Sequence, residues 1–305
     1  MTPDPAARAD ELKRELRYHN KRYYEDDDPE IGDDAYDALL NELRAIETEH
    51  PELLTPDSPT QVVGAAPVSR LEKVTHLQPM FSLANARTEE ELRGWIGRMR
   101  NHLAREGIED PGFRFVAEPK IDGLGLSLVY RDGLLERAAT RGNGEIGEDV
   151  THNIRTIEAV PKQLRGDPPA LVEVRGEVYM SLPDFQRTNE RRAEQGQPTF
   201  MNPRNSAAGA IRQLDPRQML ERPLSFWAYG IGAVDGLAFE AHSAALDWLR
   251  AMGFPVNADI ALLDSEDDLV ERCRDWEQRR GALDFEIDGV VIKVDQIALQ
   301  RRLGV

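Results

Sequence analysis

Glu118-Pro119-Lys120-Ile121-Asp122-Gly123-Leu124 lies between two short β-type runs, at 113–117 and 125–130. Three more runs of this kind, at 171–180, 225–231 and 289–294, are separated by segments with helical patterning. The helical segments are 88–106, 182–195, 207–220 and 240–252. Strands mixed irregularly with helices predict an α+β domain in which largely antiparallel sheets are flanked by helices.

The first part of the chain has a different pattern. Residues 5–24 predict a helix, which Asp26-Asp27-Asp28-Pro29 ends as a solvated turn. Asp33 is suited to cap a second helix. The apolar face of that helix consists of Tyr36, Leu39, Leu40, Leu43 and Ile46. Residues 51–67 are rich in proline and predict a linker that acts as a hinge. We therefore expect a small all-helical domain at 1–67 and a larger α+β domain at 68–305.

Composition excludes several classes of protein. The chain has 305 residues and a formal net charge of −17, so it is not a stand-alone electrostatic clamp for DNA. Its one cysteine, Cys273, permits neither an internal disulfide nor a cysteine zinc site and is expected in the core. We expect no signal peptide and no membrane span. A cytoplasmic monomer is the resulting prediction.

Lysine is rare in this sequence. Only six of the 38 basic residues are lysines, at positions 13, 21, 73, 120, 162 and 293. Arginine cannot lose its proton in a protein, so an amine that acts as a nucleophile has to be a lysine. Lys120 is the candidate, although a surface lysine before an Asp-Gly turn would have the same local sequence.

The segment around Lys120 resembles the nucleotidyl-lysine motif of DNA ligases and mRNA-capping enzymes. Other blocks narrow the resemblance to the bacterial NAD-dependent DNA ligases. They are Ala139-Thr140-Arg141-Gly142-Asn143-Gly144, Gly147-Glu148-Asp149-Val150-Thr151, Glu173-Val174-Arg175-Gly176-Glu177-Val178, Asn202-Pro203-Arg204-Asn205-Ser206-Ala207-Ala208-Gly209, Arg212-Gln213-Leu214-Asp215-Pro216 and Glu286-Ile287-Asp288-Gly289-Val290-Val291-Ile292-Lys293. The blocks span the whole chain in order, and together they are very specific.

The resemblance implies a nucleotidyltransferase fold of the ATP-grasp-like ligase type and a chemical mechanism. Lys120 would attack the α-phosphate of NAD+, form lysyl-AMP and release nicotinamide mononucleotide (NMN). In a full-length enzyme of DNA replication and repair, the AMP would then pass to the 5′-phosphate of nicked double-stranded DNA. Mg2+ or Mn2+ would assist the reaction, but no residue of this chain is assigned as a metal ligand.

The resemblance also implies roles for the residues that bind the AMP half. Glu118 would read the adenine edge, Ser82 and Leu83 would line the adenine side, and Arg141 and Glu177 would hold the ribose and phosphate. Lys293 is expected beside Lys120, where its charge would favour the free amine and, with Arg141, stabilise the phosphate. Asp122 would orient Lys120 or the ribose. Ile121, Arg204 and Arg212 complete the implied set.

Residues of the helical domain would bind the NMN half of NAD+. The cationic nicotinamide ring is well held by aromatic faces and carboxylates. The matching residues are Tyr23, Tyr24, Asp33, Asp34, Ala35, Tyr36 and Asp37. Residues 1–70 hold 17 acidic and 8 basic side chains, which suits a cation. From pattern alone, however, Tyr23 and Tyr36 could equally pack between the two helices.

Other interpretations remain open on the sequence. The same lysine chemistry occurs in ATP- or GTP-dependent nucleotidyltransferases, and a non-catalytic nucleotide-binding module is a third alternative. Gly142-Asn143-Gly144-Glu145-Ile146-Gly147 spells the G-x-G-x-x-G of Rossmann dehydrogenases, but a glycine-rich turn that presents Arg141 fits better. The six histidines show no metal spacing, so each is expected at the surface or in the core.

Two departures from the family pattern bear on function. Asn143 stands where the family usually has Asp, which leaves no charge at that position. The chain ends before a further lysine block, an oligonucleotide-binding domain, a four-cysteine zinc site, helix-hairpin-helix repeats and a BRCT domain, so zinc would belong only to that absent region. We expect an adenylation fragment that binds NAD+ and can self-adenylate but does not seal nicks unaided.

Overall fold

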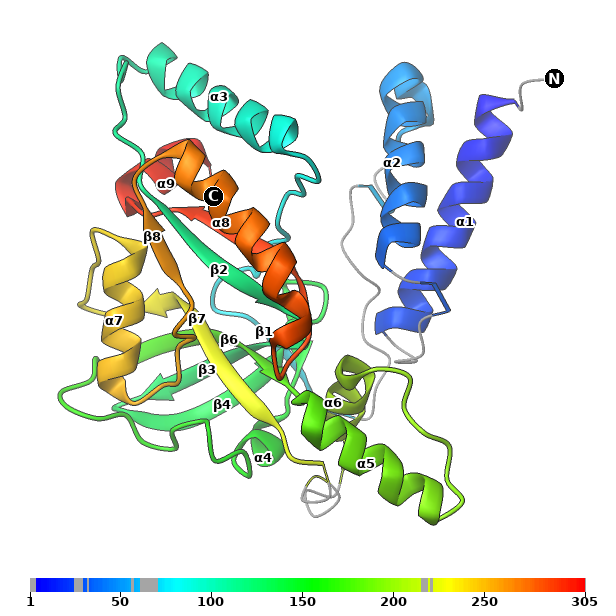
Figure 1. Ribbon diagram of the computed structural model, residues 1–305, viewed down its shortest axis with the longest axis vertical. Helices are drawn as coiled ribbons and strands as arrows, with labels where there is room; N and C mark the ends of the chain where they lie inside the picture. The colour runs from blue at the N-terminus through cyan, green and yellow to red at the C-terminus, as the bar shows by residue number, and fades with distance from the viewer. Residues whose placement is uncertain are drawn as a thin grey trace. The chain divides into compact units, whose positions relative to one another are not determined.

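The computed structural model describes residues 4–24, 30–31, 33–55, 58–60, 71–214, 219 and 222–304. The chain divides into two compact units, drawn in Figure 1. One unit comprises Met1–Ser82 with Ala139–Asp149, and the other comprises Leu83–Ala138 with Val150–Val305. The first unit thus contains a short returning segment of the chain in addition to the predicted helical domain.

A pair of helices forms the main part of the first unit. These are α1 (Pro5–Tyr24) and α2 (Asp33–Glu49), followed by the single turn η1 (Pro51–Leu53). Their shared core consists of Ala9, Leu12, Leu16 and Leu43, with Tyr36, Leu39, Leu40, Ile46 and Leu53 packed against it. The apolar face predicted for the second helix is confirmed as the face that packs.

The start of the predicted linker is not a free connection. Lys13, buried on α1, donates from Nζ to the Leu53 carbonyl oxygen at 2.6 Å and lies 3.4 Å from a carboxylate oxygen of Glu47. The hydroxyl of the buried Ser58 donates to the same Glu47 carboxylate at 2.6 Å. Residues 51–55 and 58–60 are therefore anchored on the helix pair, which corrects the expected start of the linker at 51. Residues 61–67 lie outside the described residues.

The glycine-rich segment forms a turn between strands. It joins β4 (Leu134–Thr140) to β5 (Ile146–Glu148), and β5 pairs antiparallel with β1 (Lys73–Thr75). Gly142 and Gly144 have φ angles of 55° and 93°, which side-chain-bearing residues rarely adopt. No helix opens on the third glycine, since Gly147 lies inside β5. The expected turn is confirmed, and the dehydrogenase fingerprint is excluded.

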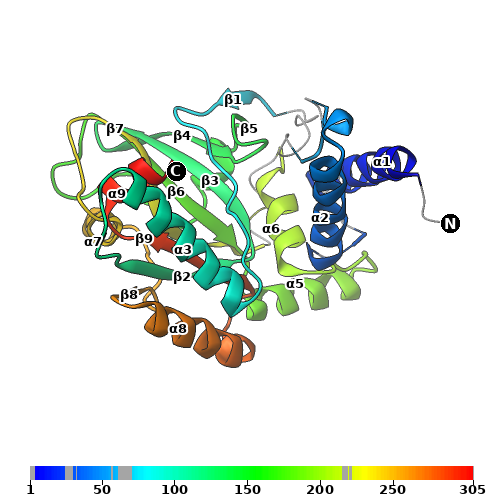
Figure 2. The same ribbon diagram turned by 90° about the horizontal axis from the view of Figure 1, so that it is seen from above.

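Two antiparallel sheets form the second unit (Figures 1 and 2). The four-stranded sheet has the order β4-β3-β6-β7, in which β3 is Leu124–Arg131, β6 is Leu171–Tyr179 and β7 is Ser225–Val234. The three-stranded sheet has the order β8-β2-β9, in which β8 is Ala261–Leu263, β2 is Phe115–Ile121 and β9 is Ile287–Val294. The predicted α+β class with antiparallel sheets is confirmed.

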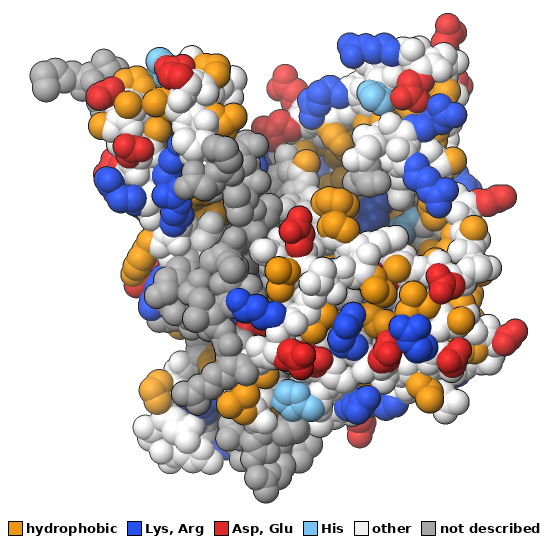
Figure 3. Space-filling view, turned by 180° about the vertical axis from the view of Figure 1, so that it is seen from behind, with side chains coloured by type: hydrophobic (Ala, Val, Ile, Leu, Met, Phe, Trp, Pro, Cys, Tyr) orange, Lys and Arg blue, Asp and Glu red, His pale blue; other side chains and the backbone are white. Residues whose placement is uncertain are grey.

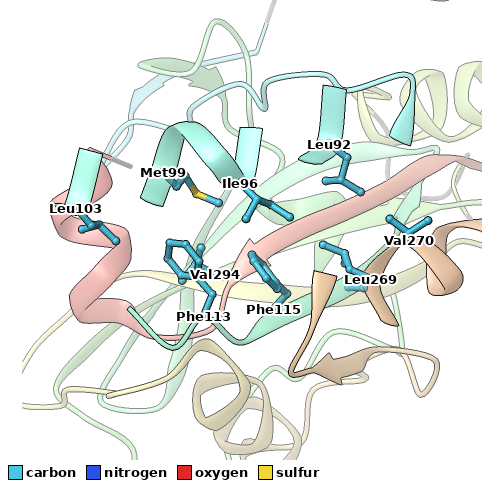
Figure 4. Packing of buried hydrophobic residues seen from close by; sticks show 10 residues of the cluster. Leu92, Ile96, Met99, Leu103, Phe113, Phe115, Leu269, Val270 and Val294 are labelled. Carbon is cyan, nitrogen blue, oxygen red and sulfur yellow. The ribbon is translucent and has the colours of Figure 1, made fainter. Parts of the chain in front are cut away.

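Helices cover these sheets. They are α3 (Glu89–Arg105), α4 (Thr151–Ile154), α5 (Leu182–Glu194), α6 (Pro203–Ile211), α7 (His242–Met252), α8 (Glu266–Arg279), the turn η3 (Arg280–Ala282) and α9 (Ile297–Leu303). Leu92, Ile96 and Leu103 of α3 belong to one buried core with Phe115 of β2 and Leu269 of α8. In Figure 4, Leu103 lies toward Phe113 and Leu92 lies at the other end of the cluster. This packing fixes β2, the strand that carries Lys120, between β8 and β9.

Sequence reasoning placed two elements incorrectly. The strand predicted at 113–117 instead runs from Phe115 to Ile121, because β9 pairs with it as far as Ile121. The other neighbour, β8, pairs only with Phe115, Val116 and Ala117. Beyond that point β2 is paired on one side alone, so Pro119, which has no N–H to donate, is tolerated. The helix predicted at 207–220 instead begins at Pro203. The Asn202 side chain caps it by accepting from the Asn205 N–H at 2.8 Å.

Candidate functional site

Lys120 lies at an irregularity in the pairing of β2 with β9. Pro119 pairs with Val290 and Ile121 with Ile287, so Lys120 stands opposite two residues of β9. The extra residue of this β-bulge belongs to β9, which bends there and re-aims its side chains, Asp288 among them. The Lys120 ammonium forms an ion pair with Asp288, and the side chain is 39% exposed. The amine is therefore accessible and held by a carboxylate.

Lys293, expected beside Lys120, lies on β9, the strand that pairs with β2. In the β2–β9 register it stands opposite Val116, four residues before Lys120. Its ammonium is 2.7 Å from Oε1 of Glu118 and donates to the Tyr229 carbonyl oxygen at 3.0 Å. Each lysine thus has a carboxylate partner of its own, and the expected proximity of Lys293 to Lys120 stays a prediction.

Glu118 is buried in a cluster of charged and polar side chains. Its Oε1 is also 2.6 Å from Nε2 of His242, the first residue of α7, and that Nε2 lies 3.2 Å from the Lys293 ammonium. Burial opposes the charged form of Glu118, but the charge of Lys293 and the hydrogen bond from His242 outweigh it. The pKa of Glu118 therefore lies below its ordinary value, and the carboxylate is ionised.

His242 is the neutral member of this cluster. Burial lowers the pKa of His242, and the charge of Lys293 lowers it further, against the opposing effects of Glu118 and Asp295. A neutral ring that makes a short contact with a carboxylate oxygen carries its proton on that nitrogen, so Nε2–H donates to Glu118. Sequence reasoning did not single out His242, because nothing near it in the chain marks it as a partner of Glu118.

Asp122 and Arg204 form a second pair near the end of β2. A guanidinium nitrogen of Arg204 is 2.8 Å from a carboxylate oxygen of Asp122, so Asp122 contacts α6 rather than Lys120. The Asp122 N–H donates to the Glu286 carbonyl oxygen at 3.0 Å. Burial and the charge of Asp122 raise the pKa of Glu286, while Arg280 opposes them. Two carboxyl groups thus share this end of the strand.

Arg141 and Ser82 meet within the first unit. The Arg141 guanidinium donates to the Ser82 hydroxyl at 3.3 Å and to the Met80 carbonyl oxygen at 3.4 Å. The side-chain oxygen of Asn143 accepts from the N–H groups of Glu145 and Ile146, at 3.0 and 2.8 Å. A neutral amide makes these bonds as well as a carboxylate does, so replacement of the usual Asp is compatible with the turn.

Two protein families match this chain. Residues 68–305 match the family "NAD-dependent DNA ligase adenylation domain", and residues 2–64 match "DNA ligase-like, N-terminal NAD+-binding domain". The chain belongs to the NAD-dependent DNA ligase adenylation domain family. It is 52% identical over 298 residues to a DNA ligase of Rubrobacter xylanophilus, covering 97% of this chain and 43% of that protein.

Other DNA ligases have similar identity to this chain and are covered to a similar extent. The chain is 50% identical over 314 residues to a DNA ligase of Roseiflexus castenholzii, covering 99% of this chain and 43% of the relative. It is 49% identical over 306 residues to a DNA ligase of Trichlorobacter lovleyi, covering 100% of this chain and 44% of the relative. The chain thus spans less than half the length of these curated relatives.

Four more residues implied by the ligase family lie in different surroundings. Glu177 lies on β6, directly beside Gly123, and Arg212 caps the C-terminus of α6. Leu83 is 54% exposed, whereas Ile121 packs against the buried cluster of Tyr179, Trp276, Phe285 and Ile287. Ile121 therefore serves the core in this structure rather than presenting a free apolar surface.

The residues proposed by the ligase resemblance to bind NMN are described only in part. Ala35 is exposed, and the hydroxyl of the half-buried Tyr36 donates to the Asn20 side-chain oxygen at 2.7 Å. The side chains of Tyr23, Tyr24, Asp33, Asp34 and Asp37 lie outside the described residues, as do residues 26–28.

The structure also bears on the expectations drawn from composition about Cys273, membrane spans and surface charge. Burial raises the pKa of the half-buried Cys273, so its thiol is protonated at neutral pH. In the part of the chain that the structure describes, no helix is long and apolar enough to cross a bilayer. On the face drawn in Figure 3, described basic and acidic side chains are interspersed rather than gathered by sign.

Proposed function

We propose that this chain performs the adenylation step of NAD+-dependent DNA joining. Residues 68–305 form the nucleotidyltransferase domain, in which Lys120 takes AMP from NAD+, and residues 1–67 form the domain that binds NMN. The observation that carries the proposal is the accessible Lys120 amine opposite the β9 bulge, in a chain that belongs to the NAD-dependent ligase family.

The proposed reaction is a transfer at phosphorus. Lys120 loses a proton to solvent, and the neutral amine, with one N–H still bonded to Asp288, attacks the α-phosphate with its nitrogen lone pair. A phosphorus–nitrogen bond forms, and the bond between the α-phosphorus and the bridging oxygen breaks. NMN leaves with that oxygen on its own phosphate group. Negative charge increases on the phosphoryl oxygens, and Lys293 and Arg141 are the cations proposed to stabilise it.

The AMP half of NAD+ is proposed to bind the site residues implied by the ligase resemblance. Glu118 accepts from the adenine amino group, while Glu177, Asp122, Arg204 and Arg212 serve the ribose and phosphate. Ser82 and Leu83 line the adenine side. The pair of Arg141 and Ser82 supports the assignment, because a guanidinium already bound to a hydroxyl is oriented before the ligand arrives.

The NMN half is proposed to bind the helical domain. Tyr23, Tyr24 and Tyr36 would offer aromatic faces to the cationic ring, with Asp33, Asp34, Ala35 and Asp37 beside them. The hydrogen bond from Tyr36 to Asn20 supports this role, because it fixes the ring of Tyr36 at the junction of α1 and α2.

Mg2+ is proposed to assist the transfer. Among the described residues, no group of three or more His, Cys, Asp or Glu side chains is arranged to hold a metal. Asp122 and Glu286 are close enough for their charges to interact, and such a carboxylate pair suits an ion that keeps water and substrate phosphates as its other ligands. The ion would offset phosphate charge when NAD+ is bound. Mn2+ could replace it.

In the longer protein, the adenylyl group would pass to the 5′-phosphate of nicked double-stranded DNA during replication and repair. We further propose that the protein acts in the cytoplasm and that this chain is a monomer. An ATP- or GTP-dependent transferase of the same lysine chemistry is less well supported, because both matched families are named for NAD.

Intact-mass spectrometry after incubation with NAD+, ATP or GTP tests the proposal. A mass gain of one adenylyl group with NAD+ alone is expected. A gain only with ATP or GTP would overturn the choice of donor, and no gain with any donor would overturn self-adenylation by this chain.

A further inference from the structure

Side chains from three elements of the second unit meet at the Glu118 carboxylate. Glu118 comes from β2, Lys293 from β9 and His242 from the start of α7. Glu118 is 3% exposed and His242 is 8% exposed, so neither group is solvated like a surface residue. A buried carboxylate of this kind is stable only because it is paired and hydrogen-bonded.

Both partners reach the same carboxylate oxygen. Nε2 of His242 lies 2.6 Å from Oε1, and the Lys293 ammonium lies 2.7 Å from Oε1. Two donors from different directions on one oxygen fix the rotation of the carboxylate about its last torsion, which is otherwise broad. The other oxygen, Oε2, is thereby presented in one orientation for an additional donor.

The backbone that carries His242 is itself held in place. The backbone N–H of His242 donates to the Asp295 carbonyl oxygen at 2.7 Å, and the backbone N–H of Ser243 donates to the Asp295 carboxylate at 2.8 Å. Asp295 is fully buried, and Arg114 pairs with it at 2.8 Å. The first turn of α7 is thus tied to the end of β9, and its position does not depend on Glu118.

We propose that His242 is a positioning residue that sets the preference for a 6-aminopurine in the nucleotide donor. By donating from Nε2 to Oε1, it holds Glu118 so that Oε2 accepts from the amino group of adenine. The inference rests on the proposed function, in which Glu118 faces the adenine edge.

The chemical basis is the difference between an amino and an oxo group. Against a fixed carboxylate oxygen, the amino group of adenine donates, whereas the 6-oxo group of hypoxanthine places one acceptor against another. Sites built to hydrogen-bond one substrate group reject analogues that leave a buried partner unpaired. If the carboxylate can rotate, it can turn to the N1–H of hypoxanthine instead, and the rejection weakens.

Self-adenylation rates measured by intact mass with NAD+ and with nicotinamide hypoxanthine dinucleotide test this. The wild-type chain is expected to prefer NAD+, and His242→Leu is expected to lower that preference about tenfold or more. His242→Gln, whose amide nitrogen can replace Nε2 as donor, should retain most of it. His102→Gln is the matched control, because His102 is exposed on α3 and contacts the Arg302 carbonyl oxygen at 3.1 Å.

The outcomes separate this inference from the proposed function. A preference in His242→Leu equal to that of the wild type, with reaction still measurable, would overturn the inference alone. Absence of any adenylyl transfer from NAD+ to the wild-type chain would overturn both. If thermal unfolding shows that His242→Leu does not fold, the preference is measured in His242→Asn, whose shorter side chain stays polar but does not reach Oε1.

Discussion

Lys120 and Asp288 form an ion pair between β2 and β9, although 168 positions separate them in the sequence. The pair is half-exposed, so its contribution to folding is small. Its effect is on the amine, whose position at the bulge it fixes.

Asp288→Asn should therefore slow self-adenylation more than it affects stability. We expect the rate with NAD+ to fall about tenfold or more, because the amine loses the charged partner that orients it. Intact-mass time courses measure this. Asp247→Asn, in an exposed pair with Arg250 on α7, is the matched control and should react like the wild type. A normal rate in Asp288→Asn would contradict the role given to Asp288.

Gly123, in the turn between β2 and β3, tests the close approach of that turn to β6. A Cβ at this position would overlap the carbonyl oxygen of Val178, which is backbone and cannot move aside. Gly123→Ala should lower the free energy of unfolding by about 1–3 kcal/mol. Gly97→Ala on α3, where a Cβ meets nothing within 4 Å, should be neutral or stabilising. Thermal unfolding of both variants checks this, and equal melting temperatures would refute the overlap.

The polar cluster of Glu118, His242 and Lys293 predicts how stability depends on pH. The pKa of His242 is lowered in the folded chain from an ordinary 6.5, so the unfolded chain binds more protons as pH falls through that value. Stability must then decrease with falling pH. The lowered pKa of Glu118 acts in the same direction at more acidic pH, near and below its ordinary 4.5.

His242→Gln removes the first of these effects. Between about pH 7.5 and 5.5, the free energy of unfolding should fall more steeply for the wild type than for His242→Gln. Urea denaturation at the two pH values measures the difference. Equal slopes would show that His242 titrates normally in the folded chain.

Glu47 anchors the segment that follows α2. Glu47→Gln leaves the buried ammonium of Lys13 without its carboxylate, which should cost about 3 kcal/mol and speed hydrogen exchange in residues 51–55. Glu42→Gln, which breaks an exposed pair with Arg8, should cost less than about 1 kcal/mol. Unchanged exchange in Glu47→Gln would mean that the segment is held by other contacts.

Local sequence patterning predicted the helices with strong apolar periodicity and the strands with clear β-type runs. The helix pair, α3, α5, α7 and the strands β3, β6 and β7 were all expected from it. For α8, the acidic residues at 264–268 predicted a loop and a helix start, which is confirmed, but no extent was predicted. Its exposed face is strongly charged, and only Leu269, Val270 and Trp276 are buried. The predicted list lacked β8, which has three residues and depends on β2 for pairing.

The site was predictable as a set of residues but not as a set of contacts. Motif resemblance identified Lys120, Glu118 and Lys293, but it did not indicate which carboxylate each lysine contacts. Which side chains meet depends on the β2–β9 register and its bulge, and neither is encoded near Lys120. His242 lies 124 positions from Glu118, so only the folded chain brings them together.

The most direct test of the account is the intact mass of the chain before and after NAD+, with Lys120→Ala alongside. We predict that the wild type gains one adenylyl group, releases NMN and loses the added mass when NMN is supplied in excess, whereas Lys120→Ala gains nothing. An adenylyl group found on folded Lys120→Ala would contradict the assignment of Lys120 as the nucleophile.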